Sequence, residues 1–158
     1  MNDAEISRYI TDNFQGVDVV VASGDSFFFY NPDSHVAPDH KFPWATLVTS
    51  DINDAFSNLD RPSVYRLNIG VSKATFQSLF GSFKLPANDD SAEQSDGALS
   101  GYDFTALDQV MPHPIYRKMY WVCVLNPSDE TIKRKVHPLL TEAYDIAVTK
   151  YNQREARS

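Results

Sequence analysis

Two polar side chains that could bind a ligand, Arg66 and Asn68, stand two positions apart in the strand-forming run 64–69. Residues two apart in a β-strand point to the same face, so both would project from one side of a sheet and the apolar residues between them from the other. An arginine can bind a carboxylate or phosphate with two parallel hydrogen bonds. The pair is therefore either part of a solvent-exposed face, where long polar side chains usually lie, or the floor of a pocket for an anionic ligand.

Arg61 could contribute to the same anion site. It lies between Asp60 and Pro62, shortly before the strand that carries Arg66. One interpretation is a turn whose charges are screened by water and contribute little to stability. The other is that Arg61 and Arg66 together bind one anionic group.

His113 is the candidate catalytic residue. It is flanked by Pro112 and Pro114, which restrict its backbone, and Tyr116 follows closely. A rigidly held imidazole beside a phenol could bind a ligand or transfer a proton near neutral pH. The alternative is that the prolines only stiffen a surface connection and that His113 is exposed.

Four aromatic residues could form the rim of a pocket above the polar face of the sheet. They are Phe28, Tyr30, Tyr116 and Trp121. The leading hypothesis is a non-enzymatic module that binds a small anionic ligand or a protein partner. The alternative is a small enzyme acting on an anionic metabolite, with His113 as acid or base and Arg66 as anchor.

Known catalytic motifs do not decide between these hypotheses. The sequence has no G-x-S-x-G, G-x-G-x-x-G, Walker or H-E-x-x-H motif. The single cysteine, Cys123, lies in an apolar run typical of an inert core strand and cannot form a thiolate zinc site alone. His35 and His40, with Asp33 and Asp39 nearby, lack regular metal-ligand spacing, so a solvated loop is favoured. We therefore expect no metal and no cofactor, and the binding hypothesis leads.

The elements that would position these residues alternate between helices and strands. Apolar spacings of three and four predict helices, β-rich runs between turn residues predict strands, and Ser72 and Ser128 are typical helix N-caps. The predicted helices span residues 3–14, 73–80 and 129 onward, and the predicted strands span residues 17–22, 26–30, 44–49, 64–69 and 115–125. Leu79 is expected to face the core, and Pro138 is expected to kink or split the last helix.

The connections between these strands predict the fold class. Hairpin-length and loop connections between residues 17 and 69 lack the helical crossovers that parallel strands need. We expect one compact α+β domain over residues 1–158, with a mainly antiparallel, curved sheet of about five strands and the N- and C-terminal helices packed on one face. Residues 87–97 contain no large apolar residue and no base, which predicts a mobile acidic loop at 86–101 inside the domain.

Charge and hydropathy bear on partners and location. The net charge is -7, and residues 1–60 contain ten acidic residues against two basic ones, Arg8 and Lys41. Such a surface repels phosphate backbones, and the one basic run, Lys133-Arg134-Lys135, is typical of a solvated helix face. Nucleic acid binding is not favoured but stays open, as does the oligomeric state. The N-terminus is acidic and no long apolar segment is present, so we expect a soluble cytoplasmic protein without a membrane partner.

Several segments resemble known families. The hairpin 24–30, the segment 59–70 and the segment 112–127 resemble, over nearly the whole chain, an uncharacterised bacterial and fungal family that carries only a domain-of-unknown-function label. The C-terminal order of a tryptophan strand, a Pro-Ser-Asp-Glu turn and a helix with Glu142-Ala143-Tyr144-Asp145 is similar, more distantly, to the MmcQ/YjbR family. That resemblance implies a compact α+β fold with a curved antiparallel sheet. It also implies DNA binding as a third candidate function.

Overall fold

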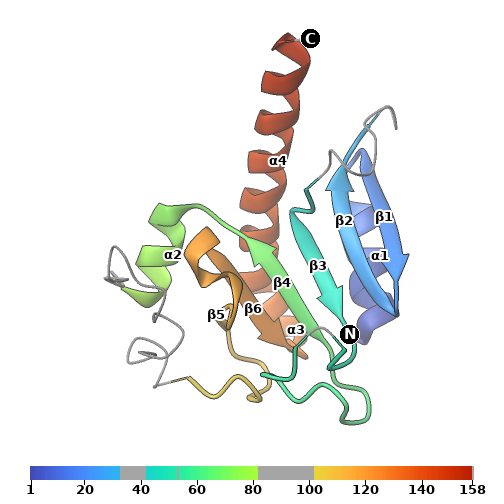
Figure 1. Cartoon of the computed structure of the whole chain (residues 1–158), viewed down its shortest axis with the longest axis vertical. Helices are drawn as coiled ribbons and strands as arrows, with labels where there is room; N and C mark the ends of the chain where they lie inside the picture. Colours follow the sequence, from blue (N-terminus) through green and yellow to red (C-terminus); the bar gives the residue numbers. More distant parts are fainter. Residues whose placement is uncertain (33–41, 53, 82–101, 158) are drawn as a thin grey trace.

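Within the residues that the structure describes, 1–32, 42–52, 54–81 and 102–157, six strands form one antiparallel sheet (Figure 1). This computed structural model orders them β1-β2-β3-β4-β6-β5. The strands are β1 (Val17–Ala22), β2 (Asp25–Tyr30), β3 (Ala45–Val48), β4 (Arg66–Gly70), β5 (Met111–Pro112) and β6 (Trp121–Leu125). The predicted loop at 86–101 and the residues around His35 and His40 lie outside the described residues.

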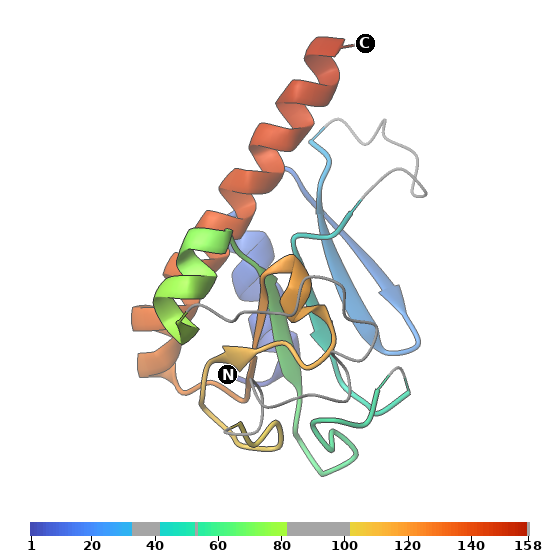
Figure 2. The same ribbon diagram turned by 60° about the vertical axis from the view of Figure 1, so that its left-hand side comes forward.

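The N- and C-terminal helices pack on the same face of the sheet (Figures 1 and 2). The α-helices are α1 (Asp3–Asn13), α2 (Lys73–Phe80), α3 (Asp129–Thr131) and α4 (His137–Arg157). Ile6 and Ile10 of α1 share one buried core with Leu140 of α4 and with Leu67 and Ile69 of β4. The α+β class, the antiparallel sheet and the placement of both helices are therefore confirmed.

The predicted strand over residues 115–125 is wrong in its first half. Tyr116–Met119 form a single 3-10 turn, η3, and only Trp121–Leu125 form a strand. The cause is local, because His113 Nδ1 accepts the backbone N–H groups of Ile115 and Tyr116 and so closes a turn instead of a strand. The short strand β5, which precedes this turn, pairs with β6 and raises the strand count from about five to six.

The irregularity expected before Pro138 takes the form of a π-helical segment, η4 (Ile132–Val136). His137 donates its N–H to the carbonyl of Ile132, five residues earlier. A proline has no N–H and its ring collides with the carbonyl four positions before it. The wider turn accommodates Pro138, so the helix continues into α4 without splitting.

The two faces of the sheet differ in what covers them. The helix-covered face carries the main core, whereas the other face carries a smaller apolar cluster built from Val48, Leu59, Met111, Cys123 and Leu125. Arg66 and Asn68 lie on this second face, as the two-residue alternation of β4 predicted. Leu79 of α2 is 45% exposed, so its predicted place in the core is wrong.

Candidate functional site

The polar residues of the second face lie on the neighbouring strands β3 and β4. Asn68 of β4 is paired with Thr46 of β3 on one side and with Cys123 of β6 on the other. Arg66 is 1% exposed and Asn68 is 3% exposed. The exposed-face interpretation of this pair is therefore wrong, and both residues belong to the floor of a covered site.

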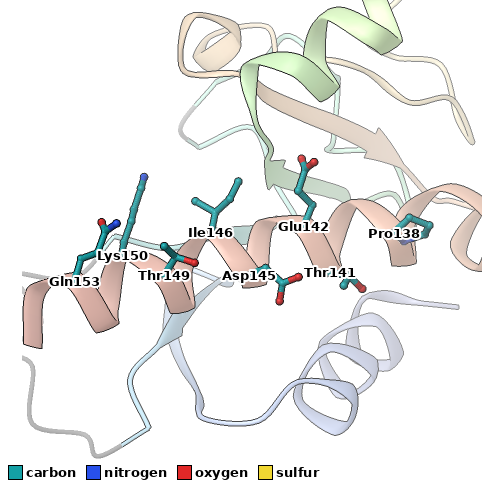
Figure 3. Close-up of a pocket in the computed structure, with 8 residues that line it drawn as sticks. All are labelled: Pro138, Thr141, Glu142, Asp145, Ile146, Thr149, Lys150 and Gln153. Atoms are coloured by element: carbon teal, nitrogen blue, oxygen red, sulfur yellow. The ribbon is translucent and has the colours of Figure 1, made fainter. Parts of the chain in front are cut away.

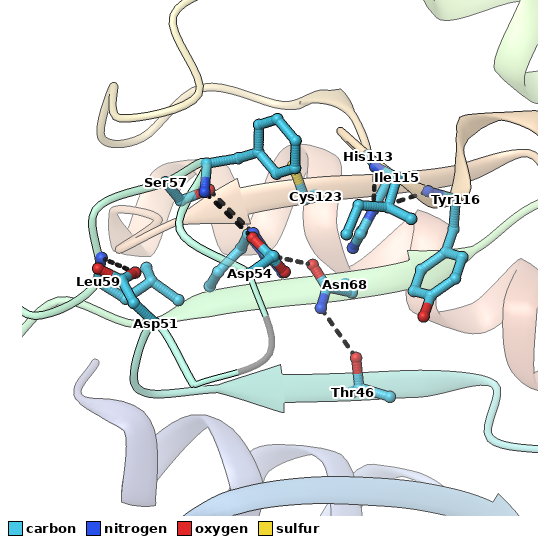
Figure 4. Close-up of polar contacts among 12 residues, drawn as sticks. Thr46, Asp51, Asp54, Ser57, Leu59, Asn68, His113, Ile115, Tyr116 and Cys123 are labelled. Carbon is cyan, nitrogen blue, oxygen red and sulfur yellow. Dashed lines mark hydrogen bonds and ion pairs between the residues drawn. The ribbon is translucent and has the colours of Figure 1, made fainter. Parts of the chain in front are cut away.

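Arg66 is held by an ion pair that the sequence did not indicate. Its two terminal nitrogens donate to the carboxylate oxygens of Asp54 at 2.9 and 2.8 Å. Its Nε donates to Asn68 Oδ1 at 3.0 Å, and Nη1 also donates to the hydroxyl of Ser57 at 3.0 Å. Figure 4 shows Asp54, Ser57 and Asn68 gathered on this side of β4.

This ion pair changes the electrostatics of the floor. Burial disfavours the charged form of Asp54, but the hydrogen bond and the charge of Arg66 outweigh it, and the pKa of the Asp54 carboxyl falls below its usual value. Asp54 is therefore ionised at neutral pH and neutralises Arg66. The guanidinium is not the free anion anchor that the sequence suggested.

Asn68 has a fixed orientation in the floor. Its Oδ1 accepts from Arg66, which cannot accept a hydrogen bond, so the amide nitrogen must point the other way. That nitrogen donates to the hydroxyl of Thr46 at 2.9 Å (Figure 4). The chain Asp54, Arg66, Asn68 and Thr46 thus forms one connected polar network across β3 and β4.

His113 is buried rather than exposed, with 1% of its surface accessible. Burial, with a further contribution from the nearby charge of Arg66, lowers the pKa of its imidazole to about 3. The ring is therefore neutral at neutral pH. Because Nδ1 accepts two backbone N–H groups at 3.0 Å, the ring proton resides on Nε2. His113 is poorly suited to proton transfer near neutral pH, but it can donate a hydrogen bond.

Most of the predicted site residues meet at one cavity of about 940 Å³. The predicted residues that line it are Tyr30, Arg66, Asn68, His113, Tyr116 and Trp121. Tyr116 is 51% exposed at this cavity, and its ring lies 4.9 Å from that of His113. A volume of this size suits a drug-sized small molecule.

Two predicted site residues lie elsewhere. Phe28 is fully buried in the helix-side core, and its neighbour Phe27 lines the cavity instead. Three consecutive phenylalanines give no two-residue alternation, so the sequence could not assign their faces. Arg61 donates to the backbone carbonyls of Ser57, Asn58 and Thr105 and is not among the residues that line the cavity.

The cavity also has lining residues that sequence reasoning missed. They are Asp25, Phe27, Phe42, Thr46, Asp54, Met119, Lys150 and Arg154, among others. Strand pairing could have identified Thr46 and Phe27, because Phe27 pairs with Thr46 and Thr46 with Asn68. Lys150 and Arg154 come from α4, and no sequence signal relates them to the sheet.

Trp121 forms part of the cavity wall by packing on Gly70. The two residues are paired between β4 and β6, and a Cβ atom at position 70 would lie 2.9 Å from Cε2 of the indole. Glycine is needed here for close approach and not for a left-handed backbone. Gly70 thereby sets the position of the indole.

A second hollow of about 560 Å³ lies along α4 (Figure 3). All the residues that line it, from Pro138 to Gln153, belong to that one helix. Its carboxylate Glu142 is already used, because it accepts the backbone N–H of Ser72 at 3.0 Å and the hydroxyl of Thr75 at the start of α2. This hollow lacks the converging polar groups of the larger cavity.

Two further observations concern metals and membranes. In the described part of the chain, no three His, Cys, Asp or Glu side chains gather as a metal site would require. None of the helices described is long and apolar enough to cross a membrane.

Burial raises the pKa of the Cys123 thiol to about 12, so this thiol is not a reactive nucleophile.

The chain belongs to the Family of unknown function (DUF6194), whose sequence profile matches residues 1–156. No curated protein and no solved structure matches the chain. The expectation of a domain-of-unknown-function family spanning nearly the whole chain is confirmed.

Proposed function

We propose that this protein is a non-enzymatic module that binds a small molecule in the 940 Å³ cavity. The observation that carries the proposal is that Arg66, Asn68, His113 and Thr46 line the cavity and each keeps a hydrogen that no bond among the described residues uses. A ligand rich in acceptor atoms could accept these hydrogens and gain net hydrogen-bond free energy.

The donor surplus can be counted from the contacts. Four of the five N–H groups of Arg66 have partners among the described residues, which leaves one hydrogen on Nη2. Asn68 uses one of its two amide hydrogens on Thr46. The Thr46 hydroxyl accepts that bond and keeps its own hydrogen to donate, and His113 offers Nε2–H.

The same electrostatics restrict the ligand. The Arg66–Asp54 pair is neutral overall, and a second anion on the floor would lie close to the Asp54 carboxylate. We therefore expect a neutral group with carbonyl or ring-nitrogen acceptors at the floor. Lys150, also on the cavity lining, supplies positive charge for an anionic end of the same ligand.

The aromatic walls suit a planar ligand body. Phe27, Tyr116 and Trp121 line the same cavity as these polar groups. Aromatic side chains favour flat ring systems through stacked or edge-on contacts. The ligand class that fits best is a heteroaromatic ring with carbonyl acceptors that is linked to a phosphate or carboxylate.

The test is a thermal-shift screen with matched pairs that differ only in charge, such as uridine with its monophosphate and riboflavin with its monophosphate. Hits would be measured by calorimetry on the wild type and on Thr46→Val, which removes one floor hydroxyl and keeps the side-chain shape. We expect Thr46→Val to weaken binding several-fold, about 1 kcal/mol. Binding that Thr46→Val leaves unchanged, or a screen without any hit, would contradict the proposal.

The alternatives have less support. An enzyme with His113 as acid or base needs an imidazole that exchanges protons near neutral pH, whereas the His113 pKa is about 3. DNA binding by analogy with the MmcQ/YjbR family would need a basic face, and the chain has a net charge of -7. Both stay predictions, as does a protein partner in place of a small molecule.

A further inference from the structure

The two edges of the sheet are protected to different degrees. At one end, β5 has only two residues and one of them is Pro112, which has no N–H to offer to another strand. At the other end, β1 has six residues, and its only charged residue is Asp18. Natural proteins usually block such an edge with charge, proline or a covering segment.

The unpaired backbone N–H and C=O groups of this edge belong to three valines of β1. The N–H of Asn31 donates to the carbonyl of Gly16, so position 16 is a hydrogen-bonded pair in the β1–β2 ladder. Hydrogen-bonded and non-bonded pairs alternate in an antiparallel ladder. Residues 18, 20 and 22 therefore bond to β2, and the N–H and C=O groups of Val17, Val19 and Val21 point outward. Among the described residues, none bonds to these six groups.

The side chains at this edge are apolar and exposed, which favours association with another strand. Val19 is 36% exposed, Val20 is 41% exposed and Val21 is 67% exposed. A six-residue β-branched strand with free ladder groups on one side is a template for another strand. We propose that β1 pairs antiparallel with β1 of a second copy of this chain, which joins the two sheets into one.

Symmetry fixes the register of that pairing. A two-fold axis perpendicular to the sheet places the same face of both sheets on the same side. Residues whose backbone N–H and C=O groups point outward must then pair with residues of the same kind. When Val19 pairs with Val19 of the second copy, Val17 pairs with Val21, and all six outward groups on each strand find partners. If the pairing were centred on Val20 instead of Val19, Val17 would lie opposite Ser23, which has a φ of 55° and lies in the turn.

The charge pattern agrees with a second copy as the occupant. In this register Asp18 lies opposite Val20 of the second copy, so no two carboxylates face each other. Three β-branched residues meet three β-branched residues across the interface, which is a favoured type of cross-strand contact. The edge is therefore complementary to itself, although each copy carries a charge of -7.

The experiment is sedimentation equilibrium of the full chain over a range of concentrations. We expect the mass to rise with concentration from 17.8 kDa toward twice that value. Val19→Pro removes an outward N–H without removing a β1–β2 hydrogen bond and should abolish the rise. Val20→Lys, opposite Asp18, should tighten association, whereas Val20→Asp should weaken it, each on the order of fivefold.

Folding of each variant is checked by circular dichroism, and the Val20 pair decides the result if Val19→Pro fails to fold. A wild type that stays monomeric at all concentrations overturns the proposal. Association that persists in Val19→Pro also overturns it. An equal effect of Val20→Lys and Val20→Asp on association would contradict the proposed register and likewise overturn the proposal. None of these measurements depends on the ligand proposed for the cavity.

Discussion

At the scale of single residues, the second face of the sheet is organised around one buried charge. Arg66 is 1% exposed, yet it forms four hydrogen bonds to Asp54, Ser57 and Asn68. A buried ion pair contributes little relative to apolar residues, but removing one partner leaves an uncompensated charge. The network therefore makes the floor rigid and makes it sensitive to single substitutions.

Asp54→Asn should destabilise the protein by about 3 kcal/mol, because it leaves the Arg66 guanidinium buried without a counter-charge. The side chains of the pair are 1% and 7% exposed, so solvent offers little screening. Arg66→Met combined with Asp54→Leu should recover most of that loss. Urea denaturation of the single and double variants measures the difference, and equal stability of all three would contradict this account of the pair.

His113 should make stability depend on pH. Its folded pKa of about 3 lies below the ordinary value of 6.5, so below pH 6.5 the unfolded chain binds a proton that the folded chain does not. Stability should therefore be complete above about pH 6.5 and fall by up to about 1.4 kcal/mol per unit as the pH decreases toward 4.

The variant His113→Asn isolates this effect. Its amide oxygen occupies the place of Nδ1 and can still accept the N–H groups of Ile115 and Tyr116. Its unfolding free energy should depend less steeply on pH between about 6.5 and 4 than that of the wild type. Parallel curves for the two proteins would show that His113 does not stay neutral in the folded state.

At the scale of elements, the site depends on the close contact between β4 and β6. Trp121 lies over Gly70, and this contact brings the indole to the cavity wall. The turn that His113 closes places Tyr116 and Met119 at the same cavity. Two local features, the glycine at position 70 and the turn closed by the His113 side chain, thus shape the aromatic wall of the cavity.

Gly70→Ala should destabilise the protein by about 1 to 3 kcal/mol, because the new methyl group would overlap the indole of Trp121. Gly81→Ala is the matched control, since nothing lies within 4 Å of its Cβ position and only its φ of 80° opposes the change. Tryptophan fluorescence should shift in the first variant alone. An unchanged spectrum for Gly70→Ala would contradict the proposed contact.

At the scale of the whole molecule, the two faces of the sheet carry different kinds of residues. Helices α1 and α4 cover one face and build the main core, whereas the other face carries the polar floor of the cavity, whose lining also includes residues of α4. Lys150 of α4 brings a positive charge to the cavity lining of a chain whose net charge is -7.

Residues 87–99 should be dispensable for folding. They lie outside the described residues, and Leu99 is the one large apolar residue among them, which is too little apolar surface to order the segment. Replacing them with a short Gly/Ser linker should change the free energy of unfolding by no more than about 1 kcal/mol, because loop-closure entropy grows slowly with length. Loss of soluble protein on replacement would contradict this prediction.

The sequence by itself determined most of the elements and the faces of the strands where side chains alternate. Short connections dictated an antiparallel sheet, and alternation in β4 placed Arg66 and Asn68 opposite the core. Local signals also predicted the caps at Ser72 and Ser128. These features depend on neighbouring residues, so they can be derived without knowing the path of the chain.

Only the tertiary structure decided how the polar residues are used. The pairing of Asp54 with Arg66 depends on how the loop after β3 folds back over the sheet, and no periodicity encodes that path. The burial of His113 and the approach of Lys150 likewise come from segments distant in sequence. A residue's charge state follows from burial and neighbours, so the chemistry of the site emerged only when those segments were in place.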